Sequence, residues 1–366
     1  MMNNAVSVFD TYFFGDIIKK IEENDMVSFE CDYVAGAHPE IMKRLVETNL
    51  ENLPGYGDDH YCESAKEKIR AACGREDADV ELLVGGTQTN MTVISTMLKE
   101  YEGVIAPDSG HINVHEAGAI EHSGHKVISI PADDGKLKAE DLRACLKAFW
   151  DNPTHPHMVF PGMVYISHPT EYGTLYTLDE LREIAGICKE HDIYLYIDGA
   201  RLGYGVMSSD TDVTLKDIAE LADVFYIGGT KVGALCGEAV VFTDGCKPDR
   251  FMTRIKTRAA LLAKGRLLGV QFDTLFTDDL YFKISKHAID MANRLKEIIR
   301  SKGWEFYHET PTNQQFILMN DEQMENLGKY VRYDIWDKYD DERTIVRLVT
   351  SWSTTEEDLD VLESVR

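Results

Sequence analysis

The chain has 366 residues, a length that can bury a large core and that suits one large domain with a smaller one. It carries 63 acidic against 38 basic residues, a formal net charge of −25 at pH 7, so its surface repels nucleic acid and anionic membranes and we expect neither as a partner. The seven cysteines include no Cys-x-x-Cys pair, and the first residues lack the features of a signal peptide. The composition therefore predicts a cytoplasmic protein with reduced thiols and no membrane segment.

The first part of the chain predicts an arm, an extended segment and a helix. Residues 1 to about 24 place apolar residues at helical spacing among acidic ones, which is typical of an amphipathic arm or packing helix. Residues 29–39 are expected to be extended, and Pro39 suits the first turn of the helix that follows. A glycine-rich loop over residues 53–60 then leads into a long helix.

A strand predicted over residues 80–84 runs into Gly85-Gly86-Thr87-Gln88, where a helix begins. Glycines at such a turn expose backbone N–H groups at the positive end of the helix, so a phosphate can bind there. The turn lacks the dinucleotide-binding pattern and the P-loop ending, and nucleotide binding has no support from it. A plain helix cap is the alternative.

Strands and helices alternate from residue 80 to residue 242, which predicts a mainly parallel, doubly wound sheet flanked by helices. His111 follows the strand predicted over residues 104–106, where its ring can lie flat on a planar cofactor; a capping or packed histidine is the alternative. The strand over residues 237–242 comes after a short link and is therefore expected to be antiparallel to its neighbour.

Two turns carry the groups around which the chain is organised. The apolar run 224–227 delivers Lys231 into a glycine-rich turn, and the strand-like run 191–198 ends in Asp198, closely followed by Arg201. Ligands bind at the carboxyl edge of such sheets. Each turn alone fits ordinary loop chemistry, but together they suit pyridoxal phosphate (PLP). Lysine would form the Schiff base, aspartate would keep the pyridinium nitrogen protonated, and arginine would lie near the substrate carboxylate.

The last part predicts a basic stretch and a smaller α+β segment. Residues 250–269 turn basic, either as a solvated helix face or as a patch that meets a phosphate or a neighbouring subunit. A long helix over residues 280–300 leads to strands at 305–307, 315–319 and 344–349, and a final helix begins near Thr354. Arg347 stands among apolar residues of the last strand, a position that an arginine tolerates only when paired with an anion.

These motifs resemble the L-threonine aldolases of the β-eliminating lyase group, PLP enzymes of fold type I, in order from about Phe29 to Thr350. The resemblance is carried by Gly55-Tyr56-Gly57-Asp58-Asp59, Gly86-Thr87-x-x-Asn90, His111-Ile112 with Glu116-Ala117-Gly118-Ala119, Asp198-Gly199-Ala200-Arg201-Leu202, Lys231 and 345–350. It implies an aspartate-aminotransferase-like fold with an amino-terminal helical arm (1–28), a large PLP-binding α/β domain (29–275) and a small α+β domain (276–366).

The resemblance also implies roles for particular residues and no metal. Lys231, His111 and Asp198 would be catalytic, with His111 stacked on the ring. Cofactor contacts would come from Gly86, Thr87, Gln88, His111, Asp198, Arg201, Thr230, Lys231 and Arg266, and substrate contacts from Arg201, Arg347, Asp32, Tyr56 and His155. Tyr56 and Arg266 resemble residues that the family lends across a dimer interface, so a homo-oligomer, dimer or dimer of dimers, is expected.

The implied reaction is cleavage of the Cα–Cβ bond of a β-hydroxy-α-amino acid, with L-threonine or L-allo-threonine giving glycine and acetaldehyde. His111 is the first candidate for the base that removes the hydroxyl proton, directly or through a water, and His155 is the second. Departures cluster on the substrate side: Cys31-Asp32-Tyr33 replaces Ser-Asp-Thr, Thr230 replaces a serine, and residues 232–238 replace a small-residue and proline tail. Alternatives are a β-eliminating lyase, racemase or aminotransferase acting on another amino acid, or an inactive binding protein with the same fold.

Overall fold

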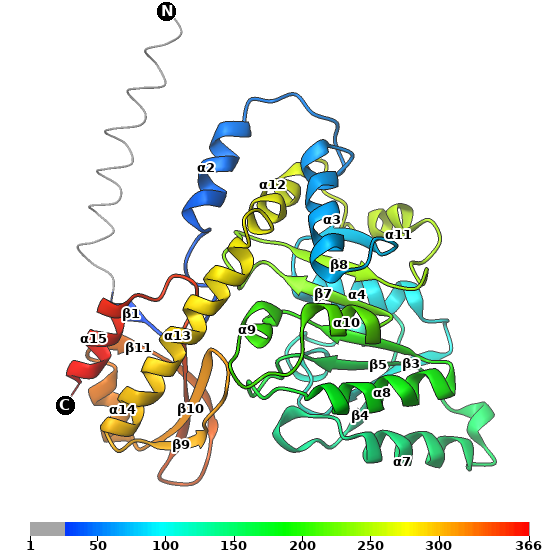
Figure 1. Ribbon diagram of the computed structural model, residues 1–366. Coiled ribbons are helices and arrows are strands. Elements are labelled where there is room, and N and C mark those ends of the chain that lie inside the picture. Colours follow the sequence, from blue (N-terminus) through cyan, green and yellow to red (C-terminus); the bar gives the residue numbers. More distant parts are fainter. Residues whose placement is uncertain (1–25, 366) are drawn as a thin grey trace, which may run out of the picture.

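A seven-stranded sheet forms the centre of the computed structural model, which describes residues 26–365 (Figure 1). Its strand order is β2-β8-β7-β6-β5-β3-β4, and β8 alone runs against its neighbours β7 and β2. The strands are β2 (Asp79–Leu83), β3 (Glu102–Pro107), β4 (Val127–Ile130), β5 (Phe160–Ser167), β6 (Tyr194–Asp198), β7 (Val224–Gly228) and β8 (Glu238–Phe242). The mainly parallel sheet and the antiparallel β7–β8 pair are both as predicted.

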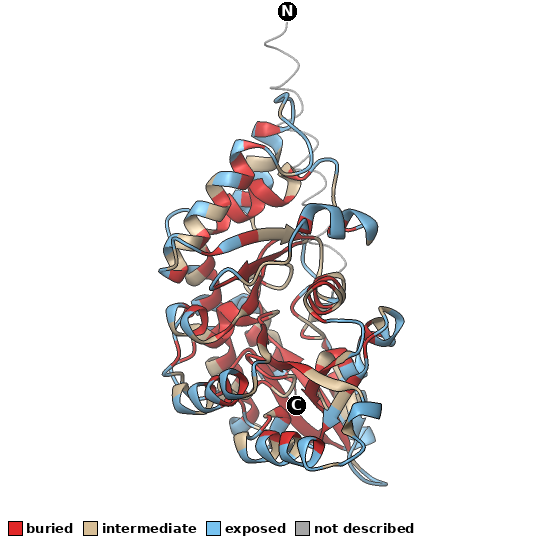
Figure 2. Ribbon diagram, turned by 90° about the vertical axis from the view of Figure 1, so that its right-hand side faces the viewer, coloured by how far each residue is buried: buried red, intermediate tan, exposed pale blue. Residues whose placement is uncertain are grey.

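Both faces of this sheet are covered, which is why its strands are apolar almost throughout. In β5, Val164 and Ile166 join the core on one face, while Met163 and Tyr165 join the core on the other. The alternation follows from the two-residue period of a strand. Figure 2 shows the strands buried and the outer sides of the helices exposed.

Helices flank the sheet on both faces. α7 (Ala139–Trp150), α8 (Leu178–His191), α10 (Leu215–Leu221) and α3 (His60–Cys73) pack on one face, and α4 (Gly86–Met97), α5 (His111–Val114), α6 (Ala119–His122) and α11 (Phe251–Thr257) pack on the other. The remaining elements of this part are α2 (Pro39–Thr48), α9 (Leu202–Val206), α12 (Arg266–Leu275) and the short 3-10 turns η1 (Asp133–Gly135) and η2 (His155–His157). Thr177 and Glu180 form a capping box at the start of α8.

The carboxyl-terminal part is a four-stranded antiparallel sheet with its own core, reached along the long helix α13 (Leu280–Ser301; Figure 1). Its order is β12 (Asp334–Lys338), β13 (Thr344–Val349), β10 (Gln314–Met319) and β9 (Glu305–His308). α14 (Asp321–Leu327) and α15 (Glu356–Ser364) belong to the same part, and β1 (Val27–Ser28) pairs in parallel with β11 (Val331–Arg332). Phe29 lies in this core with Leu295 and Val346, so the start of the described chain packs against its end.

Some predicted elements differ from the structure. The run from His191 is not all strand, because α8 continues through His191 and Asp192 ends it in a left-handed conformation (φ 54°) that aspartate tolerates. β11 and β12 were not expected, since their charged residues hide the strand pattern. The helix predicted for residues 1 to about 24 lies outside the described residues. Within residues 26–365, no helix is long and apolar enough to cross a membrane.

Candidate active site

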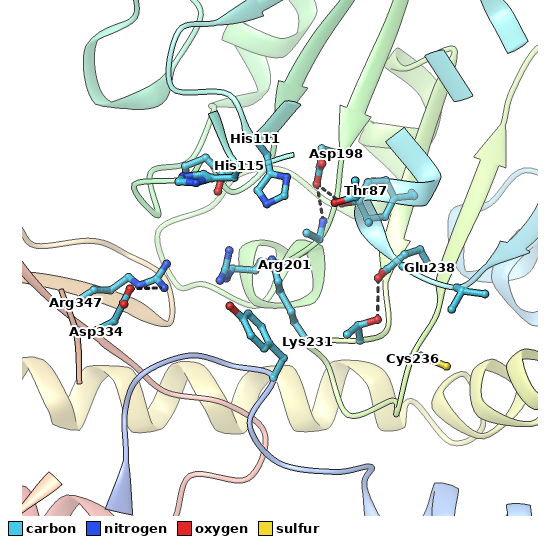
Figure 3. Close-up of a pocket in the computed structure, with 18 of the residues that line it drawn as sticks. Thr87, His111, His115, Asp198, Arg201, Lys231, Cys236, Glu238, Asp334 and Arg347 are labelled. Atoms are coloured by element: carbon cyan, nitrogen blue, oxygen red, sulfur yellow. Dashed lines mark hydrogen bonds and ion pairs between the residues drawn. The ribbon is translucent and has the colours of Figure 1, made fainter. Parts of the chain in front are cut away.

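A cavity of about 660 Å³ opens where the carboxyl ends of β2, β6 and β7 face the small sheet (Figure 3). Lys231, Asp198, Arg201 and His111 all line it, although they come from separate stretches of the sequence. Gly199 allows the turn after β6 to approach β7 closely, since a Cβ there would lie 1.9 Å from the carbonyl oxygen of Tyr226. The parallel topology thus brings these side chains to one edge.

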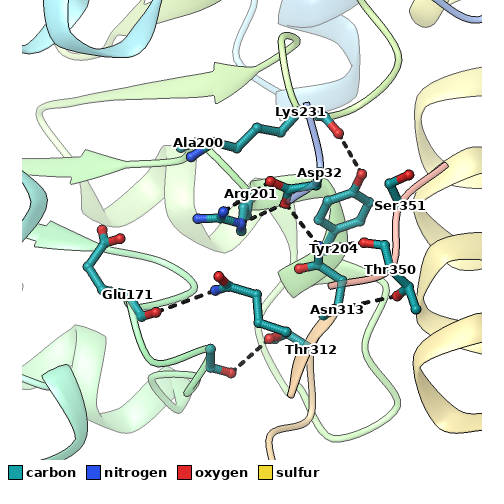
Figure 4. Close-up of polar contacts among 12 residues, drawn as sticks. Asp32, Glu171, Ala200, Arg201, Tyr204, Lys231, Thr312, Asn313, Thr350 and Ser351 are labelled. Carbon is teal, nitrogen blue, oxygen red and sulfur yellow. Dashed lines mark hydrogen bonds and ion pairs between the residues drawn. The ribbon is translucent and has the colours of Figure 1, made fainter. Parts of the chain in front are cut away.

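Lys231 directs its amine into the cavity, 6.0 Å from the centre of the Tyr33 ring. Its backbone is held by Tyr204, whose hydroxyl donates to the carbonyl oxygen of Lys231 at 2.5 Å (Figure 4). Burial and the Arg201 guanidinium lower the pKa of the Lys231 amine. A lowered pKa leaves more of the amine unprotonated, and only the unprotonated amine can add to an aldehyde.

Asp198 is a buried carboxylate at the end of β6, with an exposed fraction of 3%. It accepts hydrogen bonds from the hydroxyls of Tyr226 (2.5 Å) and Tyr165 (2.6 Å) and from the side-chain amide of Asn90 (3.0 Å). Burial raises the pKa of Asp198, but the charge of His111 and these three donors outweigh it and hold the pKa below its usual value. A fixed anion therefore faces the cavity.

His111 is joined to Asp198 through a buried chain of hydrogen bonds. Its Nδ1 lies 2.7 Å from Oε1 of Glu116, and the same oxygen accepts from the Asn90 amide at 2.7 Å. Tyr196 in turn donates to Oδ1 of Asn90 at 2.6 Å. Burial lowers the pKa of His111, but the bond to Glu116 and the charges of Glu171 and Asp198 raise it above its ordinary value.

The start of α4 lies at the rim of the cavity, where the free N–H groups of a helix can receive an anion. Gly85, Gly86 and Thr87 line the cavity, and no side chain caps the helix. A Cβ built on Gly85 would have no neighbouring atom within 4 Å, so there is room for a ligand beside this residue. Gln88, the third residue predicted to hold the phosphate, does not line the cavity, and its side-chain oxygen accepts from the N–H of Val84 at 3.3 Å.

Arg201 is fixed by Asp32 from the segment before α2, which was predicted to be extended but turns at Asp32 and Tyr33 (Figure 4). Its Nε and Nη2 donate to the two carboxylate oxygens at 2.7 and 3.0 Å, and Asn313 donates to the same carboxylate at 2.9 Å. Burial raises the pKa of Asp32, but the charges of Arg201 and Lys231 lower it below its usual value. Asp32, predicted to contact substrate, does not line the cavity; its carboxylate contacts Arg201, which does.

Arg347 reaches the same cavity from β13 of the small sheet. It is paired with an anion, as its apolar surroundings required: Nη2 lies 2.7 Å from Oδ2 of Asp334, and Nη1 donates to Gln314 at 3.0 Å. Its guanidinium carbon lies 4.8 Å from the centre of the Trp336 ring. Burial and the charge of Arg201 lower the pKa of Arg347. Both arginines line the cavity.

Besides Gln88 and Asp32, three further predicted residues lie away from this cavity. The second base candidate, His155, does not line the cavity of its own chain: η2 precedes β5, at the amino edge of the sheet, and the ring packs against Phe149, Trp150 and Phe160. Tyr56 lines a different hollow, with the Lys256 amine 4.6 Å from its ring centre. Arg266 donates to the carbonyl oxygens of Glu51 and Asn49 at 2.7 and 2.8 Å.

Several lining residues were not among the sequence candidates: Tyr33, His115, Glu171, Tyr226, Cys236, Glu238, Asp334, Ile335 and Trp336. Glu238 could have been predicted from the sequence, because it is a charged residue at the start of an otherwise apolar strand. Nothing local marks Asp334 or Trp336, because β12 reaches the cavity only through the packing of the small sheet.

The donor set fits PLP. A free amine, a fixed carboxylate, a histidine ring and an uncapped helix start surround one space, and they match the aldehyde, ring nitrogen, ring face and phosphate of the cofactor. The sheet topology and this site together define an enzyme of fold type I, the aspartate-aminotransferase-like class. Residues 28–331 match the family model described as beta-eliminating lyase, and the chain belongs to this family.

Known proteins with similar sequences or structures include threonine aldolases and other proteins of the same fold. The solved threonine aldolase of Leishmania major is 40% identical and superimposes with a TM-score of 0.89, covering 93% of this chain and 98% of that one. The low specificity L-threonine aldolase of Pseudomonas aeruginosa is 29% identical over 273 residues, 74% of this chain and 78% of its own length. An aspartate aminotransferase of Thermus thermophilus, 14% identical with a TM-score of 0.66, shares the fold over 95% of this chain and 92% of its own. The chain is accordingly a PLP-dependent lyase of the threonine aldolase and β-eliminating lyase family.

Proposed function

We propose that this enzyme cleaves the Cα–Cβ bond of a β-hydroxy-α-amino acid, with L-threonine or L-allo-threonine giving glycine and acetaldehyde. The observation that carries the proposal is the convergence of Lys231, Asp198 and the pair Arg201 and Arg347 on one cavity. The similarity to proteins named threonine aldolase favours this reaction over others of the family.

The residues that would hold the cofactor follow from the site. Lys231 would join its aldehyde, Asp198 would face its ring nitrogen, His111 would lie on the ring, and Gly86 and Thr87 would receive its phosphate. When bound, the cofactor supplies an electron sink for the pair released at Cα. A carboxylate of lowered pKa is suited to keep the ring nitrogen protonated, because their contact is charge-assisted.

The two arginines would orient the substrate. Asp32 and Asp334 hold Arg201 and Arg347 in place, while both guanidinium groups still line the cavity. A carboxylate bound between them is fixed relative to Lys231, and this fixes which bond at Cα can break. Orientation of this kind can lower a barrier by several kcal/mol.

His111 is the candidate that would remove the hydroxyl proton, directly or through one water. Glu116 bonds its Nδ1, so the other ring nitrogen is the one available for the proton. His115 also lines the cavity, with its ring centre 5.6 Å from that of His111. Of the two histidines named from the sequence, only His111 lines the cavity of its own chain, which favours it as the base.

We further propose that the enzyme works in the cytoplasm as a homo-oligomer, a dimer or dimer of dimers. Tyr56 and Arg266 lie outside the cavity of their own chain, which suits residues that a neighbouring subunit would receive. We also propose that the chain is divided into an arm (1–28), a large domain (29–275) and a small domain (276–366).

The deciding experiment is incubation of the holoenzyme with L-threonine and, separately, L-allo-threonine, followed by measurement of acetaldehyde and glycine. Equal amounts of both products are expected, and the Lys231→Ala variant should form neither and lack the visible absorbance of the holoenzyme. Ammonia and a keto acid in their place would identify a β-eliminating lyase and refute the proposal.

A further inference from the structure

Glu238 is a buried carboxyl group that lines the cavity and that the proposed reaction does not use. Glu238 is the first residue of β8, which lies between β2 and β7 (Figure 3). These two neighbouring strands lead to residues proposed to hold the cofactor. The ladder pairs Glu238 with Leu83 on β2, which runs on into the start of α4, and with Gly228 on β7, which runs on to Lys231. Its exposed fraction is 3%.

The contacts of Glu238 are those of a carboxylate built into the turn. Oε1 accepts from the hydroxyl of Thr230 at 2.8 Å, and Oε2 accepts from the N–H of Gly229 at 3.1 Å. The oxygen of Thr230 accepts from the N–H of Gly237 at 3.0 Å. While Glu238 is charged, the hydroxyl proton of Thr230 is therefore used in the hydrogen bond to its carboxylate.

Placing a phosphate dianion at the start of α4 would bring it into the same cavity as this buried anion. Like charges in a poorly solvated space cannot all persist, and the usual outcome is that one carboxylate takes up a proton. A protonated carboxyl group can also donate a hydrogen bond, which the charged form cannot. The charged or titratable groups that act on Glu238, or on which it acts, are Lys231, Asp198, Tyr196, Tyr226, Tyr281 and Cys236.

We propose that Glu238 is the proton-binding residue of the phosphate site: it takes up a proton from solvent when the phosphate of the cofactor binds, so that cofactor affinity falls as the pH rises. The proposal depends on the phosphate position at the start of α4 and not on which amino acid is cleaved. Burial raises the pKa of Glu238 to about 8, against the opposing effects of Thr230, Lys231 and Gly229. Below that pH the group already holds its proton, whereas above it binding must draw one from solvent.

The test uses apoenzyme and 4-deoxypyridoxine 5′-phosphate, a probe that keeps the phosphate but lacks the aldehyde. Equilibrium dialysis at pH 7 and pH 9 is expected to show a fall in affinity of about tenfold, the loss that one proton with a pKa of about 8 produces. The Glu238→Gln variant should lose most of this dependence. The same measurement with 4-deoxypyridoxine, which lacks the phosphate, shows how much of the pH dependence of the affinity comes from titration of the ring.

A matched control is Glu171→Gln, which removes a carboxylate from the same cavity beside Ser167 rather than beside Thr230. It should keep the pH dependence of the wild type. A Glu238→Gln variant with the same pH dependence as the wild type would overturn the proposal. If that variant does not fold, titration calorimetry of the wild type in two buffers at pH 8 decides: proton uptake is expected, and no uptake overturns it. These measurements are of binding, so absence of threonine cleavage would refute only the proposed function.

Discussion

Asp198 shows how single residues acquire their properties from the fold. Its carboxylate is almost wholly buried, and the charge of His111, two tyrosine hydroxyls and one amide keep it ionised. Neither a buried carboxylate alone nor a tyrosine cluster alone would have that effect, because burial by itself favours the neutral acid. The charge that the cofactor chemistry needs is therefore a property of the cluster.

We expect Asp198→Asn to retain bound cofactor but to lower kcat by about 10²–10³-fold, the range seen when one preorganised electrostatic contact is removed. Lys231 and the start of α4 are untouched, so cofactor content, measured by absorbance, should be close to that of the wild type. The exposed Asp210, changed to Asn, is the control and should leave both quantities unchanged. Near-normal kcat in Asp198→Asn would refute the role of this carboxylate.

A second prediction at this scale concerns pH. Glu116 helps to raise the pKa of His111, and a base acts only when it is unprotonated, so activity should rise as the pH passes that pKa. Glu116→Gln removes the negative charge and should move the acidic limb of the kcat profile to lower pH. A purely structural role would lower kcat at every pH without moving the limb. An unmoved limb would therefore contradict the positioning role of Glu116.

At the scale of elements, the segment before α2 joins three parts of the molecule through Asp32. Asp32 binds Arg201 in the turn after β6 and Asn313 just before β10, and Asn313 also donates to the carbonyl oxygen of Thr350 at 2.8 Å (Figure 4). A single buried carboxylate thus joins the first described segment to both sheets.

Asp32→Asn should lower the free energy of unfolding by about 3 kcal/mol, since removing one partner leaves Arg201 buried and uncompensated. The pKa of Asp32 is lowered in the folded state, so its contribution is present above the ordinary carboxyl pKa and is lost as the pH falls below it. Urea unfolding at neutral and acidic pH measures this. The variant should approach the wild type in acid; an equal gap at both pH values would contradict the charge as cause.

At the scale of the whole molecule, the proposed interface predicts complementation. Arg266→Ala and Lys231→Ala should each be nearly inactive, but mixing them after subunit exchange should restore up to about a quarter of wild-type activity, because half of the subunit pairs hold one intact site. Mixing Lys231→Ala with Asp198→Asn is the control: both changes fall in the same chain's site, so no recovery is expected. Absence of recovery in the first mixture would refute a shared site.

The amino-acid sequence by itself determined the sheet and the groups at its carboxyl edge. Its apolar runs and turns specify where strands end, and neighbouring parallel strands end at one edge, so Lys231, Asp198, His111 and Thr87 had to lie near one another. The same rule, applied to the start of β5, would have placed His155 at the opposite edge.

Only the tertiary structure decided what completes the site. The pairing of Asp32 with Arg201, the approach of Asp334 and Trp336, and the burial of Glu238 beside Thr230 all join segments far apart in the chain. Local patterns report which face of an element is buried, but not which distant element covers it. Those partners depend on how the small sheet and the first described segment pack against the large sheet, and burial among them sets the charges on which the chemistry depends.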